Sequence, residues 1–293
     1  MELLTDKTGD EGLPGQERGL AMLAVMTCTT MAVFDGAMVN IALPQIADVL
    51  HVAPGDAVWV TNGYLLTTAM TLAIFSALAV RTRFRKLFSF CVALFTLSSL
   101  GCALSSSLEM LVAMRLLQGI GGAATLSIAP AILRSIFPNR LLGRILGVNA
   151  LLIATNTAIA PVIGGALLSA VGWTWLFAIN LPLGMVSLLL ALRTLPDART
   201  ATTGPFDFAG AVWSAMMLEA VIMASNAFSH AGSQNTRALV TSGIYGGVAF
   251  IAGLLFVRRQ QRSPQPLLPL TLFASVRLYL AALTLLVSFV SAG

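Results

Sequence analysis

The chain has 293 residues, of which 57% are hydrophobic and only 10% are charged, and its net charge is +5. This balance excludes a soluble domain, and the positive charge indicates loops that face anionic lipid rather than a nucleic-acid partner. About 20 apolar residues in a helix cross a bilayer, and backbone in lipid must satisfy its own hydrogen bonds. The sequence therefore predicts an all-α polytopic membrane protein.

Nine apolar runs predict nine helices. In chain order their predicted spans are 19–46, 57–80, 87–104, 108–133, 143–171, 175–195, 208–228, 238–257 and 278–293. A tail at 1–18 precedes the first six helices, which fill 19–195. A linker at 196–207 separates them from two further helices at 208–257, and a loop at 258–277 leads to the ninth run. That run has about 16 residues where about 20 are needed, so we expect a truncated C-terminus.

The basic residues predict the orientation of the helices. Of the 17 Lys and Arg residues, all but Arg115 and Arg237 lie before the first run, after an even-numbered run, or within a few residues of such a loop, as Arg144 and Arg193 do. Loops rich in Lys and Arg stay on the cytoplasmic side of a membrane. The N-terminus is therefore predicted to be cytoplasmic, and its acidic first residues are unlike the basic start of a signal peptide.

Three charged residues inside the apolar runs are candidates for function: Asp35, Arg115 and Glu219. A charge at the bilayer centre costs about 2.5–3.5 kcal/mol even on lenient insertion scales, so such residues indicate a functional site. From the helical rise, Asp35 lies roughly 14 Å and Arg115 roughly 10 Å below the outer surface, so they can pair if their helices are neighbours. Pairing would keep Asp35 ionised, and breaking the pair would favour its protonation, as a proton-coupled carrier requires.

Each of these three charges also has a structural interpretation. Arg115 could extend to the outer lipid headgroups. Asp35 could be a buried acid that is satisfied by hydrogen bonds between helices. Glu219, near the middle of its run, is either protonated and structural or a second acidic site for a proton or cation.

Neutral side chains near these charges are candidates for contact with a small-molecule substrate. They are Phe34, Asn40, Gln118 and Asn156. Small residues let membrane helices approach closely, and a proline removes a backbone donor and bends its helix. The candidates for close packing and bending are Gly119, Gly122, Pro161, Gly164 and Gly165.

Four stretches together resemble the major facilitator superfamily, and within it the fourteen-helix drug:proton antiporters. They begin at Asp35 (Asp-Gly-Ala-Met-Val-Asn-Ile-Ala-Leu-Pro), at Met114 (Met-Arg-Leu-Leu-Gln-Gly), at Asn156 (Asn-Thr-Ala-Ile-Ala-Pro-Val-Ile-Gly-Gly) and at Trp173. The resemblance covers essentially the whole chain. It implies a six-helix N-terminal bundle, two linker helices and the start of a second bundle. It also implies that Arg115 takes part in proton transfer.

The loop between the second and third helices departs from the family pattern, which is small-x-Leu-x-Asp-Arg-x-Gly-Arg-Lys. Val80 stands at the acidic position and Arg83 at the glycine position, whereas Arg81, Arg85 and Lys86 are kept. The resemblance implies that this loop gates the cytoplasmic side, and the missing acid puts that gate in doubt.

The resemblance implies proton-coupled efflux of lipophilic or cationic drugs across a bacterial inner membrane, with protons moving the opposite way. One alternative is a carrier for a different small solute. Another is a truncated remnant or subunit without independent transport, which a partner chain supplying the missing bundle would complete. No enzyme, cofactor or metal site is expected, because His51 and His230 have no ligand spacing and no phosphate loop is present.

Overall fold

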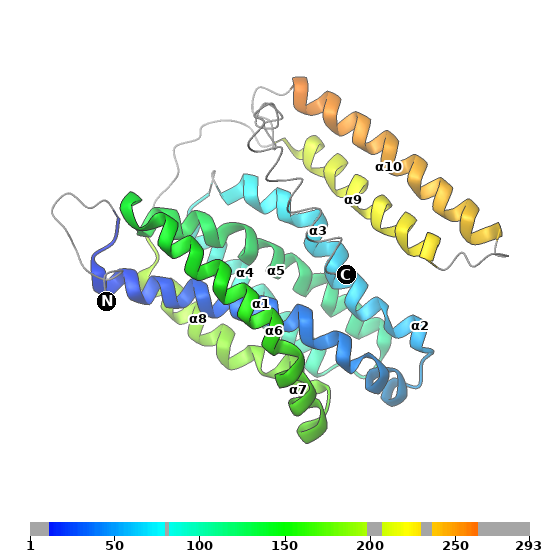
Figure 1. The fold of residues 1–293 in the computed structure, drawn as a ribbon, viewed down its shortest axis with the longest axis horizontal. Helices are drawn as coiled ribbons and strands as arrows, with labels where there is room; N and C mark the ends of the chain where they lie inside the picture. The colour runs from blue at the N-terminus through cyan, green and yellow to red at the C-terminus, as the bar shows by residue number, and fades with distance from the viewer. Residues whose placement is uncertain (1–11, 80–81, 198–206, 230–235, 263–293) are drawn as a thin grey trace. The chain divides into compact units, whose positions relative to one another are not determined.

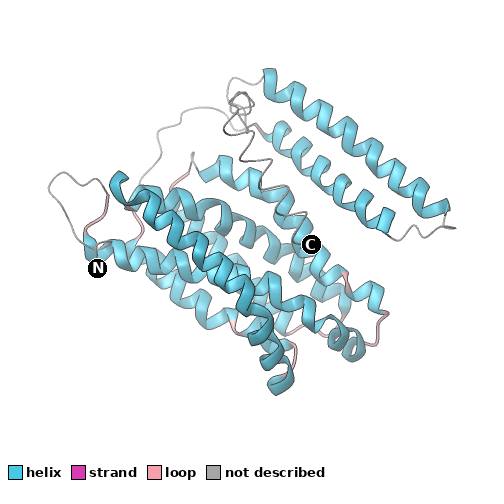
Figure 2. Ribbon diagram, viewed as in Figure 1, coloured by secondary structure: helices cyan, strands magenta, loops and turns pink. Residues whose placement is uncertain are grey.

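The computed structural model describes residues 12–79, 82–197, 207–229 and 236–262. Within these ranges every regular element is helical, as Figure 2 shows. The chain divides into two compact units, Met1–Thr203 and Gly204–Gly293. The predicted all-α class is confirmed, whereas the finer boundaries between bundle, linker and inserted helices stay predictions.

Helix bounds follow the predicted runs to within a few residues (Figure 1). The first unit contains α1 (Gly15–Leu50), α2 (Pro54–Ala57), α3 (Trp59–Ala79), α4 (Phe84–Ala103), α5 (Leu108–Ile136), the 3-10 helix η2 (Asn139–Leu141), α6 (Leu142–Val171), α7 (Thr174–Ala178) and α8 (Asn180–Thr194). The second unit contains α9 (Phe208–Ser229) and α10 (Thr236–Arg262). The predicted ninth helix at 278–293 lies outside the described residues.

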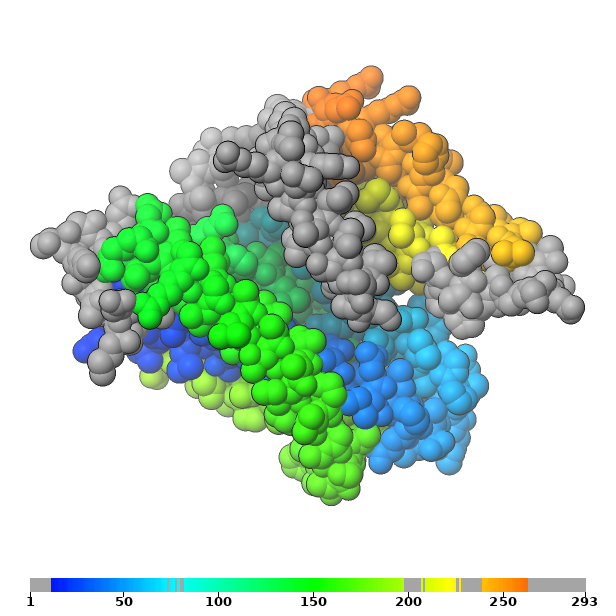
Figure 3. All heavy atoms as spheres, viewed as in Figure 1, coloured from blue at the N-terminus to red at the C-terminus, as the bar shows by residue number. Residues whose placement is uncertain are grey.

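Length and composition indicate that the chain crosses a membrane several times. Seven helical segments in the described ranges are long and apolar enough to span a bilayer. The described part of α9 adds a shorter apolar stretch, Ala209–Ala224. Large apolar side chains such as Leu151 and Val162 on α6 are mostly exposed, and α6 forms much of the face of the first unit in Figure 3. Lipid is the favourable neighbour for such a surface, so this is a multi-pass membrane protein.

Two prolines have different effects on helix continuity. The predicted helix at 175–195 is divided into α7 and α8, with Ile179 between them. Pro182 explains the division, because its ring clashes with the carbonyl four residues earlier and it has no N–H to donate. By contrast, α1 continues through Pro44 and ends where His51 adopts a left-handed conformation with φ 53°.

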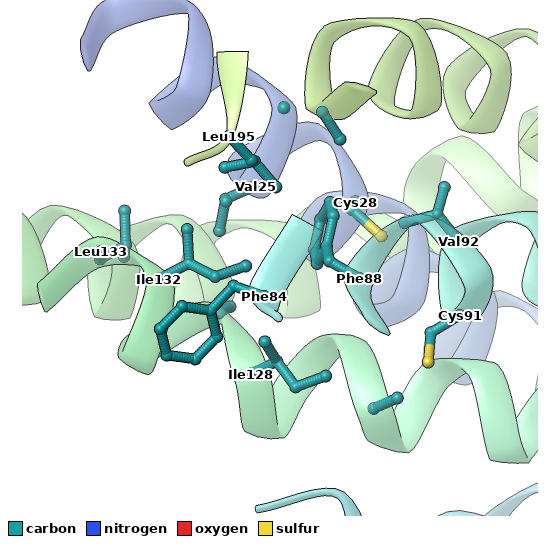
Figure 4. Packing of buried hydrophobic residues seen from close by; sticks show 14 of the residues in the cluster. Val25, Cys28, Phe84, Phe88, Cys91, Val92, Ile128, Ile132, Leu133 and Leu195 are labelled. Atoms are coloured by element: carbon teal, nitrogen blue, oxygen red, sulfur yellow. The ribbon is translucent and has the colours of Figure 1, made fainter. Parts of the chain in front are cut away.

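The core of the first unit lies between α1, α4 and α5, with the end of α8 beside them. The close-up in Figure 4 shows buried apolar side chains from these helices meeting in one cluster. They include Val25, Cys28, Phe88, Val92, Ile128, Ile132 and Leu195. Because α1 also contacts α6, it holds a central place in this unit.

Glycines bring α5 very close to α3 and α4. A Cβ atom on Gly119 would lie 2.7 Å from the backbone oxygen of Tyr64 on α3. One on Gly121 would lie 2.8 Å from the backbone nitrogen of Phe95 on α4. Small residues permit this approach, which would be blocked by any side chain. The polar residues on the same part of α5 are therefore held directly against both neighbouring helices.

The second unit is a pair of helices held together by polar contacts as well as apolar packing. Asp207 caps the start of α9, because its Oδ1 accepts a hydrogen bond from the backbone nitrogen of Gly210 at 3.1 Å. Nε of Arg259 on α10 donates to the same oxygen at 3.1 Å. Further along, the hydroxyl of Ser242 on α10 donates to the carbonyl of Ala224 on α9 at 2.9 Å. These contacts fix the register of the pair.

Candidate functional site

A buried ion pair joins α1 to α5. Nη1 of Arg115 donates to Oδ2 of Asp35, and neither side chain is exposed. The structure therefore brings together the two charges that the depth estimate placed at similar heights. This direct contact replaces the alternative in which Arg115 extends to the lipid headgroups, because its side chain has no accessible surface.

Two neutral amides complete the contacts of the Asp35 carboxylate. Nε2 of Gln118 on α5 donates to Oδ1 at 2.8 Å, and Nδ2 of Asn180 on α8 donates to the same oxygen at 3.0 Å. With Arg115, Asp35 accepts three hydrogen bonds and faces only donors. An ionised carboxylate has acceptor oxygens and no hydrogen, so it fits these contacts, whereas a protonated carboxyl does not.

Arg115 is also anchored by groups other than Asp35. Its Nε donates to the backbone oxygen of Val60 on α3 at 3.0 Å. Its guanidinium carbon lies 4.2 Å from the ring centroid of Tyr64 and 5.6 Å from that of Phe177. A guanidinium over an aromatic face gains cation–π attraction, especially where water is excluded. The cation is therefore held on α3 by contacts that do not depend on the carboxylate.

Gln118 lies inside this network and has no exposed surface. Its Oε1 accepts from Nη1 of Arg115 at 2.7 Å, and its Nε2 donates to Oγ of Ser99 on α4 at 2.7 Å as well as to Asp35. The sequence suggested contact with substrate for this residue. Its enclosed position instead makes it a bridge between the two charges and α4.

The geometry can link proton binding to helix movement. A protonated carboxyl needs an acceptor for its hydrogen, but the Asp35 oxygens face the donor nitrogens of Arg115, Gln118 and Asn180. A proton on the remaining lone pair of Oδ2 would have no acceptor among these groups, and it would remove the charge that attracts Arg115, Gln118 and Asn180. Because these residues lie on α5 and α8, protonation weakens the attachment of α1 to one of those helices.

The other candidate substrate contacts lie apart from the ion pair. Phe34 is partly buried against apolar residues of α1 and its neighbours, and Asn40 is exposed on α1. Asn156 on α6 is almost buried, and its Nδ2 donates to the hydroxyl of Thr30 on α1 at 2.9 Å. Of these three residues, Asn156 lies at the α1–α6 contact through its bond to Thr30.

Glu219 lies on α9, in the second unit, and is partly buried. Within the described ranges it has no hydrogen bond or ion pair, so both interpretations of this residue remain. In the same ranges, no group of three or more His, Cys, Asp or Glu residues is arranged to hold a metal ion.

The candidate packing residues differ in how closely they are approached. A Cβ atom on Gly122 would lie 2.8 Å from the hydroxyl of Tyr64, and one on Gly164 would lie 3.0 Å from Cγ of Met38. With Gly119, these glycines sit at real helix contacts. At Gly165 a Cβ atom would meet none of the described residues within 4 Å, and its packing role stays a prediction. Pro161 lies inside the continuous helix α6 and is exposed.

The predicted gate loop is described only in part. Arg81 lies outside the described residues, Arg85 is partly buried, and Lys86 is exposed at the start of α4. The non-consensus Arg83 forms the contact that the sequence did not suggest. Its Nη1 lies 2.5 Å from Oδ2 of Asp197, which follows α8. This exposed ion pair ties the loop between α3 and α4 to the segment after α8.

Three residues of the network were not singled out from the sequence: Tyr64, Ser99 and Asn180. All are buried, and each comes from a different helix. Neutral polar residues are common in membrane helices, so their presence alone does not mark a site. A polar residue two positions before Pro182 was a usable signal for Asn180, since that proline starts a new helix there.

Comparison with known proteins identifies the family. The sequence pattern of the Major Facilitator Superfamily matches residues 25–293. The chain is 39% identical over 284 residues to the uncharacterized transporter YebQ of Escherichia coli (strain K12), which covers 97% of this chain and 61% of that protein. It is 36% identical over 259 residues to the tetracenomycin C resistance and export protein of Streptomyces glaucescens, which covers 88% of this chain and 47% of that protein. The chain thus spans 47% to 61% of the length of these relatives.

A solved structure shows the same fold. A bacterial homolog of the human lysosomal transporter Spinster, in an inward-facing and unoccupied conformation, aligns with a TM-score of 0.50 at 19% identity. The alignment covers 85% of this chain and 64% of that one. The sequence match, the helical fold and the order of the four motifs agree: the chain belongs to the Major Facilitator Superfamily.

Proposed function

We propose that this chain carries the proton-coupling site of an exporter that moves lipophilic or cationic compounds across a bacterial inner membrane in exchange for protons. The observation that carries the proposal is the buried ion pair of Asp35 and Arg115. Charged residues inside a membrane are costly and therefore mark functional sites. A relative that is named as a resistance and export protein supports the direction of transport. The basic loops support a cytoplasmic N-terminus.

In this proposal Asp35 binds the proton, and the protonated side chain separates from Arg115. The ionised pair closes α1 against α5. When Asp35 is protonated its attraction to Arg115 is lost, and Arg115 stays on α3 with Val60 and Tyr64. The contact between α1 and α5 then opens, which is the kind of local change that a rocking bundle can use.

The substrate is proposed to bind beside this site. Phe34, Asn40 and Asn156, on α1 and α6, supply an apolar surface with neutral polar groups, which suits compounds of varied shape. Glu219 is proposed as a second acidic site, and Arg81, Arg85 and Lys86 as the cytoplasmic gate loop. Alternating access requires a second bundle that moves against the first one.

Proton release on substrate binding tests the coupling without requiring transport. The purified chain is held in weakly buffered detergent solution at a series of acidic pH values, so that Asp35 carries a proton before the compound is added. It is mixed with a lipophilic cation, tetraphenylphosphonium, and the pH change is recorded. We expect release of protons from the unchanged chain and none from Asp35→Asn. The control is Asp56→Asn, which removes an exposed carboxylate next to α3 and should not alter the release.

Two outcomes would contradict the proposal. Equal proton release from Asp35→Asn and the unchanged chain would remove Asp35 from the coupling. Binding of uncharged or anionic compounds in preference to the cation would favour a carrier for a different small solute. A separate labelling test addresses the orientation: Lys86→Cys should react with an impermeant thiol reagent only when the cytoplasmic side is accessible.

A further inference from the structure

One buried stripe of α8 faces α1 and α4. It consists of Asn180, Gly184, Ser187 and Ala191, which recur at helical spacing. A Cβ atom on Gly184 would overlap the side chain of Thr96 on α4, so only glycine permits this approach. Ser187 donates to the carbonyl of Ala24 on α1 at 2.8 Å. The close approach of Gly184 to Thr96 fixes the rotation of α8 next to Asn180, whereas Ser187 ties the following turns of α8 to α1.

Ser99 determines which end of each neighbouring amide faces it. Its hydroxyl donates to the carbonyl of Phe95 at 2.8 Å, which uses its only hydrogen. Its oxygen is left to accept, from Gln118 at 2.7 Å and from Asn180 at 3.4 Å. Both amides must therefore present their NH₂ groups on this side, and the same NH₂ groups also reach Asp35. The donor character around the carboxylate is imposed by α4.

The geometry points to Asn180, oriented by Ser99, as a positioning residue that keeps Asp35 ionised and directed at Arg115. This inference rests on the proposed function. It adds α4 and α8 to the helices whose contacts change when Asp35 is protonated. Asn180 does not exchange the proton itself. Its N–H bonds more strongly to a charged carboxylate oxygen than to the carbonyl oxygen of a protonated acid.

Few other ionisable groups lie around Asp35. Arg115 faces it from α5, Tyr64 from α3 and Cys102 from α4. In the described ranges α7 has no ionisable residue. The ionisable residue of α6 is Arg144, in its first turn, and that of α8 is Arg193, in its last turn. The contact from α8 is thus a neutral amide, so its removal changes hydrogen bonding at Asp35 without adding or removing a charge.

Infrared difference spectroscopy of the full chain in lipid can follow the protonation of Asp35 directly. The carbonyl band of the protonated acid is assigned by its loss in Asp35→Asn and recorded as a function of pH. In Asn180→Ala we expect the band to appear at a higher pH than in the unchanged chain, because one hydrogen bond to the charged form is lost. Ser99→Ala should shift the band in the same direction by less, since it loosens both amides but keeps them.

The control is Ser187→Ala, which removes a buried hydrogen bond from the same helix to α1 but does not touch Asp35. It should lower the melting temperature without moving the band. A band that appears at the same or a lower pH in both Asn180→Ala and Ser99→Ala would overturn the inference. A shift of equal size in Ser187→Ala would also overturn it, because general loosening would then explain the effect.

The result is distinguishable from failure of the proposed function. If Asp35→Asn abolishes proton release but Asn180→Ala leaves the band unmoved, Asp35 couples and Asn180 does not position it. If Asp35→Asn releases protons normally while the band shifts in Asn180→Ala, the positioning inference holds and the coupling proposal fails.

Discussion

Replacing Arg115 with methionine tests whether the ion pair dominates the stability of the first bundle. The substitution keeps a long apolar side chain and removes the guanidinium. Three hydrogen bonds are lost, to Asp35, Gln118 and the oxygen of Val60. The larger effect is the charge left on Asp35, which is 1% exposed and retains only two amide donors.

The expected magnitude separates these contributions. A typical hydrogen bond contributes about 1 kcal/mol, whereas breaking a buried ion pair by removing one partner costs about 3–5 kcal/mol. We therefore expect Arg115→Met to lower the unfolding free energy by about 3–5 kcal/mol near neutral pH.

A double-mutant cycle checks the origin of this effect. Asp35→Asn keeps an oxygen for the two amide donors but removes the charge. The double variant should be less destabilised than the sum of the single variants, by at least about 2 kcal/mol. Unfolding is measured by SDS titration in mixed micelles, with helix content followed by circular dichroism. Additive costs, or a cost below about 1 kcal/mol for Arg115→Met, would refute the assignment of a strong buried pair.

Three further predictions use the same chain. Arg115→Lys should reduce substrate-induced proton release by about tenfold, since an ammonium cannot keep both the carboxylate and the α3 carbonyl, and Arg115→Ala should reduce it further. Gly119→Val should lower the unfolding free energy by about 2 kcal/mol or more, because a backbone oxygen occupies the new side chain's space; Gly165→Ala, which meets open space, should change it by less than about 0.5 kcal/mol. Arg83→Ala should cost less than about 1 kcal/mol and the cost should disappear in high salt, because Arg83 and Asp197 are 39% and 41% exposed; a larger, salt-independent loss would contradict this.

Hydropathy predicts the helices well because their lengths are set by the bilayer. Each predicted run up to residue 262 corresponds to one observed helix, apart from the division of 175–195 into α7 and α8 and the additional short elements α2 and η2, and most ends differ by only a few residues. The division at Ile179 was missed because hydropathy does not register a local break in an apolar run. Pro182 was visible in the sequence, and its steric effect was sufficient to predict the new helix start.

The candidate site was predictable only in its charged part. Asp35 and Arg115 stand out because charges in apolar runs are rare, and similar depth suggested that they meet. Ser99 and Asn180 were not predictable in this way, because neutral polar residues occur at many positions of these helices. Which of them converge depends on the rotation of each helix about its axis, and glycine contacts such as that of Gly184 with Thr96 set this rotation.

The anchorage of Arg115 on α3 has an electrostatic consequence for the order of binding events. While Asp35 is ionised, the two opposite charges cancel and the interior is neutral overall. Once Asp35 takes up a proton, the guanidinium remains in place and the local charge becomes positive. In a medium of low permittivity this repels any other cation across several ångströms. A proton and a cationic compound would then exclude one another at a distance, even if they never share an atom.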